Sequence, residues 1–251
     1  CDVITVEEGG TGFTLLTGEA FSLPADKVSM EQRAAEAFFA ALGVPVPPLT
    51  VRLEKNIPAF AGLGGGSADV AALLRCLRRL YAAGMPDEAL RAIGLTVGSD
   101  VPFCVSGGTS LAEGRGERLT DLPPLPVCQI VLCKPDFGIS TPELFVLADG
   151  AVLSKRPDIA GLTAALQGGE LTGVTDRLCN VFEEFLPERY REVFRIKEIL
   201  LAHGALNAAM SGSGPTVYGI FESAAEAQRA AEVLKKSYQQ TYVAKPVKKL
   251  V

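Results

Sequence analysis

The chain has 251 residues, of which 48% are hydrophobic and 21% charged, with a formal net charge of −5 at pH 7. This composition is that of an ordinary globular protein, long enough for one large domain or two smaller ones. No basic run occurs before the last ten residues, no apolar stretch reaches membrane-spanning length, and acidic residues occupy the start, where a signal peptide would be basic and apolar. We therefore expect neither nucleic acid nor a membrane as a partner.

Six cysteines and one histidine are scattered along the chain without metal-ligand spacing. No C-x-x-C pair occurs, so a zinc site is not expected. Cys76, Cys104, Cys128 and Cys133 lie within apolar patterns, and we expect them to be small core residues. This use of cysteine indicates a reducing, cytoplasmic environment.

The first half of the chain predicts strands alternating with helices. The strand-like runs at 2–7 and 11–16 are separated by a Glu-Glu-Gly-Gly turn, which is typical of a β-hairpin. Arg75, Arg78 and Arg79 fall largely outside the apolar stripe of a helix over 67–81, and we expect them on its solvated face. The other elements expected here are a helix over 29–42, a strand over 50–55, a short helix near 86–94, and strands near 101–105 and 109–113.

A boundary between two lobes is expected near 120–126, where three prolines occur close together. Strands and helices interleave on both sides of it, which predicts the α+β class. The elements expected beyond it are a strand over 127–133, helices near 141–148, 158–167, 177–185 and 187–203, strands near 205–210 and 215–221, a helix over 223–236 and a last strand over 240–245.

The segment from Pro58 to Asp69 is rich in glycine and runs directly into the helix over 67–81. Backbone N–H groups of such a loop can surround an anion, and the helix N-terminus adds unpaired donors and partial positive charge. A P-loop has a lysine directly before its serine or threonine, and this loop has none before Ser67. The loop also lacks the third glycine of a dinucleotide fingerprint. It is therefore either a nucleotide-phosphate loop of another architecture or a plain turn.

Two further segments are candidates for the same site. Asp100, within Gly98–Phe103, either accepts a proton from a substrate hydroxyl or satisfies turn and helix-cap amides. The small residues over 211–216 form either a second phosphate-compatible loop or a hairpin turn. Together with the first glycine-rich loop, the second could close over one nucleotide from two sides.

The segment over 138–145 predicts a helix that starts at Pro142 and is capped by Ser140 or Thr141. Phe145 lies one turn into this helix, where its ring could stack on a base or pack in the core. From the residues alone, core packing is the better prediction. The run that begins at Asn180 predicts only a helical segment.

These segments, in this order, resemble the GHMP kinases, the family named for galactose, homoserine, mevalonate and phosphomevalonate kinases. Residues 58–69 resemble the central motif of that family, and residues 211–216 resemble its C-terminal glycine-rich motif. The match spans nearly the whole chain. The segments that are similar to the branch acting on a cytidine-diphosphate-linked methylerythritol are 55–58, 98–103, 113–117, 140–145 and the run from Asn180.

The resemblance implies an α+β fold of two lobes with an ATP cleft between them. Residues 1–122 would form a lobe like domain 2 of ribosomal protein S5, and residues 123–251 a ferredoxin-like lobe. It also implies a small-molecule kinase, a monomer or weak homodimer, that uses ATP and Mg2+. The enzyme would phosphorylate the 2-hydroxyl of its methylerythritol substrate in the non-mevalonate route to isoprenoid precursors.

The resemblance assigns roles to individual residues. Asp100 would be catalytic, orienting the substrate hydroxyl and taking its proton, and Ser67 would lie near the metal. Phe145 would lie against the cytosine, which reverses the core prediction. The residues around the ATP phosphates would be Pro58, Ala59, Phe60, Ala61, Gly62, Leu63, Gly64, Gly65, Gly66, Ser67 and Ala68. The residues at the substrate would be Asp100, Thr141, Pro142, Phe145, Ser211, Gly212, Ser213 and Gly214.

The chain departs from the family at its start. The Ala-Lys-Ile-Asn-Leu strand that supplies the family's catalytic lysine, and the Asp-Gly-Tyr-His turn that contacts the cytosine, do not occur in it. Either both precede Cys1 in the natural protein, or the chain is a degenerate relative that lacks them; because Cys1 is no natural start, we expect the first. Ala68 stands where many relatives have serine. The competing hypotheses are a GHMP kinase acting on homoserine or a mevalonate derivative, and a non-catalytic nucleotide- or metabolite-binding protein of this fold.

Overall fold

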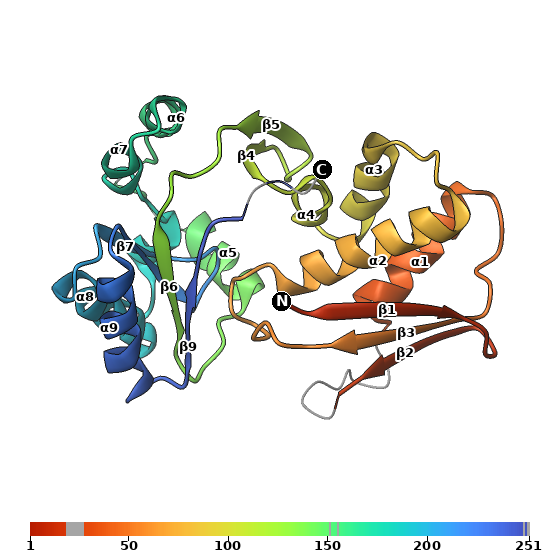
Figure 1. The fold of residues 1–251 in the computed structure, drawn as a ribbon, viewed down its shortest axis with the longest axis horizontal. Helices are drawn as coiled ribbons and strands as arrows, with labels where there is room; N and C mark the ends of the chain where they lie inside the picture. Colours follow the sequence, from red (N-terminus) through yellow and green to blue (C-terminus); the bar gives the residue numbers. More distant parts are fainter. Residues whose placement is uncertain (19–27, 151, 155, 248, 250–251) are drawn as a thin grey trace. The chain divides into compact units, whose positions relative to one another are not determined.

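The computed structural model of the chain describes residues 1–18, 28–150, 152–154, 156–247 and 249 (Figure 1). Strands and helices interleave along the chain, so the predicted α+β class is confirmed. Within the described ranges, no helix combines the length and the apolar character needed to cross a membrane. The chain divides into two compact units: unit 1 comprises Cys1–Pro58, Gly64–Asp121 and Lys249–Val251, and unit 2 comprises Ala59–Leu63 and Leu122–Lys248.

Unit 1 contains a three-stranded sheet in the order β1-β3-β2. Strand β1 (Val3–Glu8) pairs antiparallel with β3 (Leu49–Glu54), while β2 (Phe13–Thr17) pairs parallel with the other edge of β3. The predicted hairpin is therefore wrong, although both of its strands exist. The turn between them instead bonds to the chain that enters β3: Gly9 N–H donates to Pro48 O at 2.9 Å, and Gly12 O accepts from the N–H of Leu49 at 2.9 Å.

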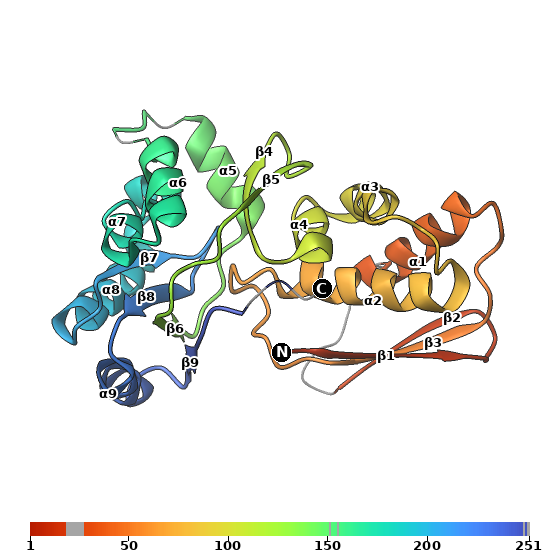
Figure 2. The ribbon, with the colours of Figure 1, turned by 45° about the horizontal axis from the view of Figure 1, so that its top comes forward.

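The helices of unit 1 cover one face of this sheet (Figure 2). Ser29 caps the first of them by accepting a hydrogen bond from the N–H of Gln32 at 2.9 Å. Fully buried side chains such as Phe38 and Leu74 form the core between helices and sheet. The helices are α1 (Met30–Ala41), α2 (Gly65–Tyr81), α3 (Asp87–Val97) and α4 (Val101–Ser106), and a two-stranded sheet of β4 (Thr109–Glu113) and β5 (Arg118–Leu122) follows.

Helix α4 replaces the strand expected near 101–105. Pro102 lies in its first turn, where a missing N–H costs nothing and the fixed φ suits a helix. Val101 and Val105 are both buried, at the i, i+4 spacing of a helix face. Arg75 of α2 then donates to the carbonyl oxygens of Cys104 at 2.9 Å and Val105 at 2.5 Å. The expectation that Arg75 is merely solvated is therefore wrong, because it satisfies the C-terminal end of α4.

Unit 2 contains a four-stranded antiparallel sheet in the order β7-β8-β6-β9. Helices α8 and α9 pack against it through buried residues such as Ile196, Leu200 and Ala227. The succession β6, α8, β7, β8, α9, β9 is the ferredoxin-like β-α-β-β-α-β pattern, as expected. The elements are β6 (Gln129–Lys134), α8 (Glu192–Ala202), β7 (Asn207–Met210), β8 (Val217–Phe221), α9 (Ala224–Lys235) and β9 (Gln240–Ala244).

The helix expected over 177–185 is only a single 3-10 turn. Asn180 precedes it and accepts a hydrogen bond from the N–H of Phe182 at 3.0 Å, so the chain starts a new turn there. The remaining elements of unit 2 are α5 (Thr141–Asp149), α6 (Ile159–Gly168), α7 (Leu171–Thr175), η1 (Val181–Phe185) and η2 (Glu188–Tyr190).

The cysteines follow the core prediction in part. Cys128 and Cys133 are buried, whereas Cys76 and Cys104 are half-buried. Burial raises the pKa of the Cys133 and Cys104 thiols to about 11. Both are therefore neutral, unreactive thiols at physiological pH.

Candidate functional site

The N-terminus of α2 has open backbone donors. Its N-cap residue, Gly64, adopts a left-handed conformation (φ 66°) and offers no side chain to cap the helix. The Gly64 carbonyl accepts the first helical hydrogen bond, from the N–H of Ala68 at 2.9 Å. The N–H groups of the first turn, over 65–67, precede any intrahelical partner and carry the positive end of the helix dipole. This end of α2 therefore suits a phosphate group.

Buried charges tie the two ends of the glycine-rich segment together. The ammonium of Lys55, before the segment, pairs with the carboxylate of Asp69 at 2.7 Å and also with Asp2. The side chains of Lys55, Asp2 and Asp69 are only 12%, 4% and 3% exposed. The second oxygen of Asp2 accepts from the N–H groups of Asn56 at 2.5 Å and Ile57 at 2.7 Å. The chain before the loop is thus fixed to both β1 and α2.

The surroundings of these three groups shift their pKa values in different directions. Burial is the main cause that raises the pKa of Asp69 to about 6, against the opposing effect of Lys55. Burial works against the charge of Lys55, but its hydrogen bonds to both carboxylates prevail and raise its pKa. Burial likewise opposes ionisation of Asp2, yet backbone and lysine hydrogen bonds hold its pKa below the usual value. Lys55 is therefore committed to this cluster and does not present a free amine.

Asp100 occupies the N-cap position of α4, yet its side chain makes no capping hydrogen bond. The side chain is exposed, and within the described part of the chain no hydrogen bond or ion pair engages its carboxylate. Asp100 therefore does not cap α4, and the prediction that its carboxylate satisfies cap amides is wrong. A Cβ built on Gly98 would lie 3.8 Å from Ser67 Oγ, so the segment containing Asp100 runs beside the start of α2.

The turn over 113–117 packs on the segment over 98–103, which contains Asp100. A Cβ at Gly116 would collide with the carbonyl oxygen of Ser99, and its φ of 109° also requires glycine. Unit 1 thus gathers the second half of the first glycine-rich segment, Asp100 and this turn.

The first half of that segment contacts the second glycine-rich segment within unit 2. Ser211 Oγ donates to the carbonyl oxygen of Gly62 at 2.8 Å, and the N–H of Thr216 donates to Ala61 O at 3.2 Å. A Cβ on Gly62 would collide with Ser211 O, and its φ of 72° is left-handed. Two glycine-rich segments 149 residues apart therefore lie side by side.

An exposed aromatic ring stands on this part of the site. Phe60 is 79% exposed and has a φ of 52°, an uncommon backbone conformation for a residue with a side chain. A Cβ on Gly138 would lie 3.1 Å from Phe60 Cβ, so the chain leading to α5 passes directly against it. Left-handed bulky residues of this kind concentrate at functional sites.

The start of α5 lies against the second glycine-rich segment. Ser140 caps α5, which has Pro142 in its first turn, and Thr141 Oγ1 lies 2.6 Å from Ser213 Oγ. Phe145 is 56% exposed and meets the ring of Phe182 edge to face at 5.3 Å. The core prediction for Phe145 is therefore wrong, and its ring is accessible to a ligand.

A cavity of about 400 Å3 lies between the second glycine-rich segment and the start of η1. Asn180 lines it, a residue for which the sequence alone predicts no chemical role. In the described residues, no cluster of three or more His, Cys, Asp or Glu side chains is arranged to hold a metal ion. The lining residues are Pro157, Cys179, Asn180, Val181, Phe182, Met210, Ser211, Gly212 and Tyr218.

Comparison with known proteins places these features in context. Residues 29–108 match the family model of the GHMP kinases N terminal domain, and residues 162–240 match the model of the GHMP kinases C terminal domain. The 4-diphosphocytidyl-2-C-methyl-D-erythritol kinase of Clostridium acetobutylicum is 35% identical over 246 residues, covering 98% of this chain and 86% of the relative. The kinase of the same name from Caldicellulosiruptor saccharolyticus is 36% identical over 234 residues, covering 93% and 80%.

Solved structures show the same likeness. A crystal structure of 4-(cytidine 5'-diphospho)-2C-methyl-D-erythritol kinase superposes with a TM-score of 0.77 at 30% identity, covering 98% of this chain and 85% of the other. The homoserine kinase of Cytophaga hutchinsonii has a TM-score of 0.76 at 20% identity, covering 99% and 85%. At that identity the second match carries the fold alone.

Proposed function

This chain belongs to the GHMP kinase family, and we propose that it transfers the γ-phosphoryl group of ATP to the 2-hydroxyl of 4-diphosphocytidyl-2-C-methyl-D-erythritol. The observation that carries the proposal is the side-by-side packing of Ala59–Leu63 on Ser211–Thr216. It joins the two phosphate-compatible segments of the family in one place. The identity of about a third to relatives of that name, over nearly the whole chain, supports this acceptor.

The first glycine-rich segment fits the phosphates of ATP. Gly62 leaves no room for a side chain against Ser211, and Gly64 leaves the first turn of α2 uncapped, so the backbone can approach a ligand closely. We assign residues 58–68 to the phosphates, with their amides as donors. Mg2+ bound with ATP supplies charge neutralisation on the transferred group, and Ser67 is the residue we place beside it.

Asp100 is the residue that we assign to the acceptor hydroxyl. Its exposed carboxylate is free of hydrogen-bonding partners among the described residues, so it can accept a hydrogen bond from an alcohol without breaking another contact. A hydroxyl held in this way is oriented for attack, and its proton has an acceptor as the O–P bond forms.

The start of α5 is the element that we assign to the cytidine of the acceptor. Phe145 offers an exposed ring face for a base, and Thr141 and Pro142 precede it in the first turn of α5. The contact between Thr141 and Ser213 links the start of α5 to the segment over 211–214, whose amides we assign to the phosphate side of the substrate.

The test is ADP release with Mg-ATP and a panel of acceptors: 4-diphosphocytidyl-methylerythritol, homoserine and mevalonate. Product mass is read in the same tube. We expect one phosphoryl group on the first acceptor only, and a chain preceded by an Ala-Lys-Ile-Asn-Leu strand is assayed in parallel. Phosphorylation of homoserine or mevalonate instead would replace the proposed acceptor. ATP binding without turnover in the extended chain as well would favour a non-catalytic protein.

The Asp100→Asn variant is the matched control for this assay. Because its amide is isosteric but cannot take the proton, we expect kcat to fall by about two to four orders of magnitude. The melting temperature should not change, since the carboxylate has no folded-state partner among the described residues. Full activity of this variant would remove Asp100 from the proposed reaction.

A further inference from the structure

The second glycine-rich segment is short of side chains that could fix its own shape. It links β7 to β8, and both Gly212 (φ 54°) and Gly214 (φ 74°) have left-handed conformations. Its internal hydrogen bonds are Ser211 N–H to Thr216 O and Gly214 N–H to Ser211 O, each 2.8 Å. Glycines gain much freedom when a loop loosens, so this segment needs support from outside.

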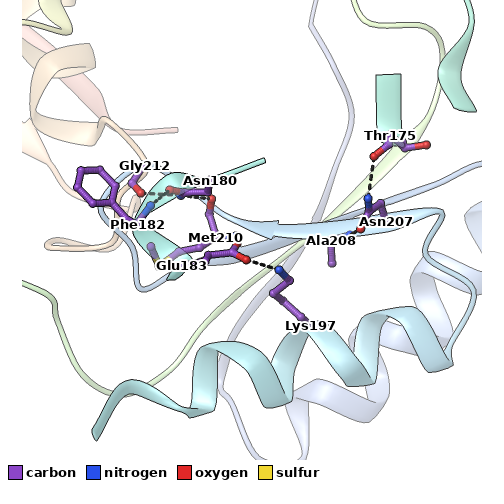
Figure 3. A network of polar contacts seen from close by, with 9 residues as sticks. All are labelled: Thr175, Asn180, Phe182, Glu183, Lys197, Asn207, Ala208, Met210 and Gly212. Carbon is purple, nitrogen blue, oxygen red and sulfur yellow. Dashed lines mark hydrogen bonds and ion pairs between the residues drawn. The ribbon is translucent and has the colours of Figure 1, made fainter. Parts of the chain in front are cut away.

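Asn180 supplies that support through its amide group (Figure 3). Its Nδ2 donates to two carbonyl oxygens, those of Met210 and Gly212, each at 2.8 Å. Its Oδ1 accepts from the N–H of Phe182 at 3.0 Å. The amide nitrogen therefore bonds to the backbone at and just before the loop, while the amide oxygen bonds to the second residue of η1.

Glu183, in the 3-10 turn that follows Asn180, holds the other backbone group of Met210 at the same strand edge. Its Oε1 accepts from the N–H of Met210 at 2.6 Å, and its other oxygen pairs with Lys197 of α8. Strand β7 is an edge strand, so Met210 has no neighbouring strand on its outer side. The side chains of Asn180 and Glu183 bond to the C=O and N–H of Met210 at this open edge instead.

The contact to Gly212 O fixes the direction of one particular N–H group. In a trans peptide unit the C=O and the following N–H point in opposite directions. Because Gly212 C=O points at Asn180, the N–H of Ser213 points away from it. Among the described residues this N–H has no hydrogen-bond acceptor. It is a free donor next to the side chain that Thr141 contacts.

We propose that Asn180 is a positioning residue, which aims the Ser213 N–H at an anionic oxygen of the bound substrate. This inference rests on the proposed function of residues 211–214 as the phosphate-side segment. Asn180 itself does not touch the ligand in this account. It acts by holding the Gly212–Ser213 peptide in one of its two orientations.

The test is Asn180→Asp, which keeps the size of the side chain but places a carboxylate oxygen against two carbonyl oxygens. The repulsion should turn the Gly212–Ser213 peptide away, and we expect kcat/KM for the acceptor to fall by about tenfold or more. Asn207→Asp is the matched control. Asn207 makes the same kind of contacts at the other end of β7, donating to Thr175 O and accepting from Ala208 N–H, both at 2.8 Å. We expect it to change kcat/KM by no more than about twofold.

A second measurement does not depend on activity. The 15N–1H resonance and hydrogen exchange of Ser213 and Gly214 are followed in the ligand-free chain. We expect both to change in Asn180→Asp and not in Asn207→Asp; if Asn180→Asp does not fold, Asn180→Ala is measured instead. Unchanged Ser213 and Gly214 amides in the Asn180 variants, or an equal loss of kcat/KM in Asn207→Asp, would overturn the inference. Absence of kinase activity in the chain preceded by the Ala-Lys-Ile-Asn-Leu strand would contradict the proposed function, while the amide measurement would still decide the role of Asn180.

Discussion

The two glycine-rich segments are anchored by opposite chemistry. The first is tied at its ends by the buried ammonium of Lys55 between Asp2 and Asp69. The second is held at Gly212 by the neutral amide of Asn180, which donates to two carbonyl oxygens, and the paired Glu183 reaches only Met210 before it. Because glycine has no side chain beyond a hydrogen atom, each loop is held by side chains from another part of the chain. Loops of similar composition can therefore differ in their dependence on pH: the ionic anchor contains a carboxylate with a pKa of about 6, whereas the amide of Asn180 does not ionise.

The largest effect is expected from removing the cation of the first anchor. Lys55→Met leaves two carboxylates that are 4% and 3% exposed without their partner. Breaking a buried ion pair in this way costs about 3–5 kcal/mol, so urea unfolding should show a loss of that order. Lys249→Met is the control, because Lys249 and Asp121 are 48% and 67% exposed and their pair should contribute less than about 1 kcal/mol. Equal losses in the two variants would mean that the first loop is not anchored by charge.

A pH series tests the charged anchor of the first loop. Asp69 has a folded-state pKa of about 6 against an ordinary value of 3.8, so its contribution to stability is present at low pH and lost as pH rises through 6. Between about pH 4 and pH 7, the chain should therefore lose up to about 3 kcal/mol relative to Asp69→Asn. Asp2 has a lowered pKa, so its contribution is present above 3.8 and lost as pH falls further.

Urea unfolding at several pH values measures both carboxylates. Asp2 and Asp69 should change the free energy of unfolding in opposite directions as pH rises, so Asp2→Asn and Asp69→Asn should remove pH dependences of opposite sign. Asn180→Ala, at the second anchor, should shift stability by the same amount at every pH in the series. A pH-dependent shift there would show that the second anchor also depends on an ionisable group.

Local sequence patterns predicted much of the candidate site. The start of α2, the Ser140 cap of α5 and the position of residues 211–214 between two strands each depend on neighbouring residues. Local chemistry of this kind can be read without knowing the fold.

Features that depend on distant pairing could not be predicted from one sequence. β3 lies between β1 and β2 and pairs with both. The residues of the turn between β1 and β2 give no sign that a third strand will separate them. Arg75 lies outside an apolar stripe, yet it finds the carbonyl groups of α4, whose helical state was itself missed. Asn180 had no evident role until the fold brought it to Met210 and Gly212, 30 and 32 residues away.

The smallest effect concerns backbone strain, which only the first segment carries on a residue with a side chain. Gly212 and Gly214 adopt positive φ without penalty, whereas Phe60 does so at 52°. Phe60→Gly should therefore be more stable than Phe60→Ala by up to about 1 kcal/mol, since both remove the ring but only glycine relieves the strain. Because the ring is 79% exposed, its loss alone should cost little stability. If both variants also raise the KM for ATP, the strain holds an aromatic contact to the nucleotide; an unchanged KM in both would make the strained ring incidental to binding.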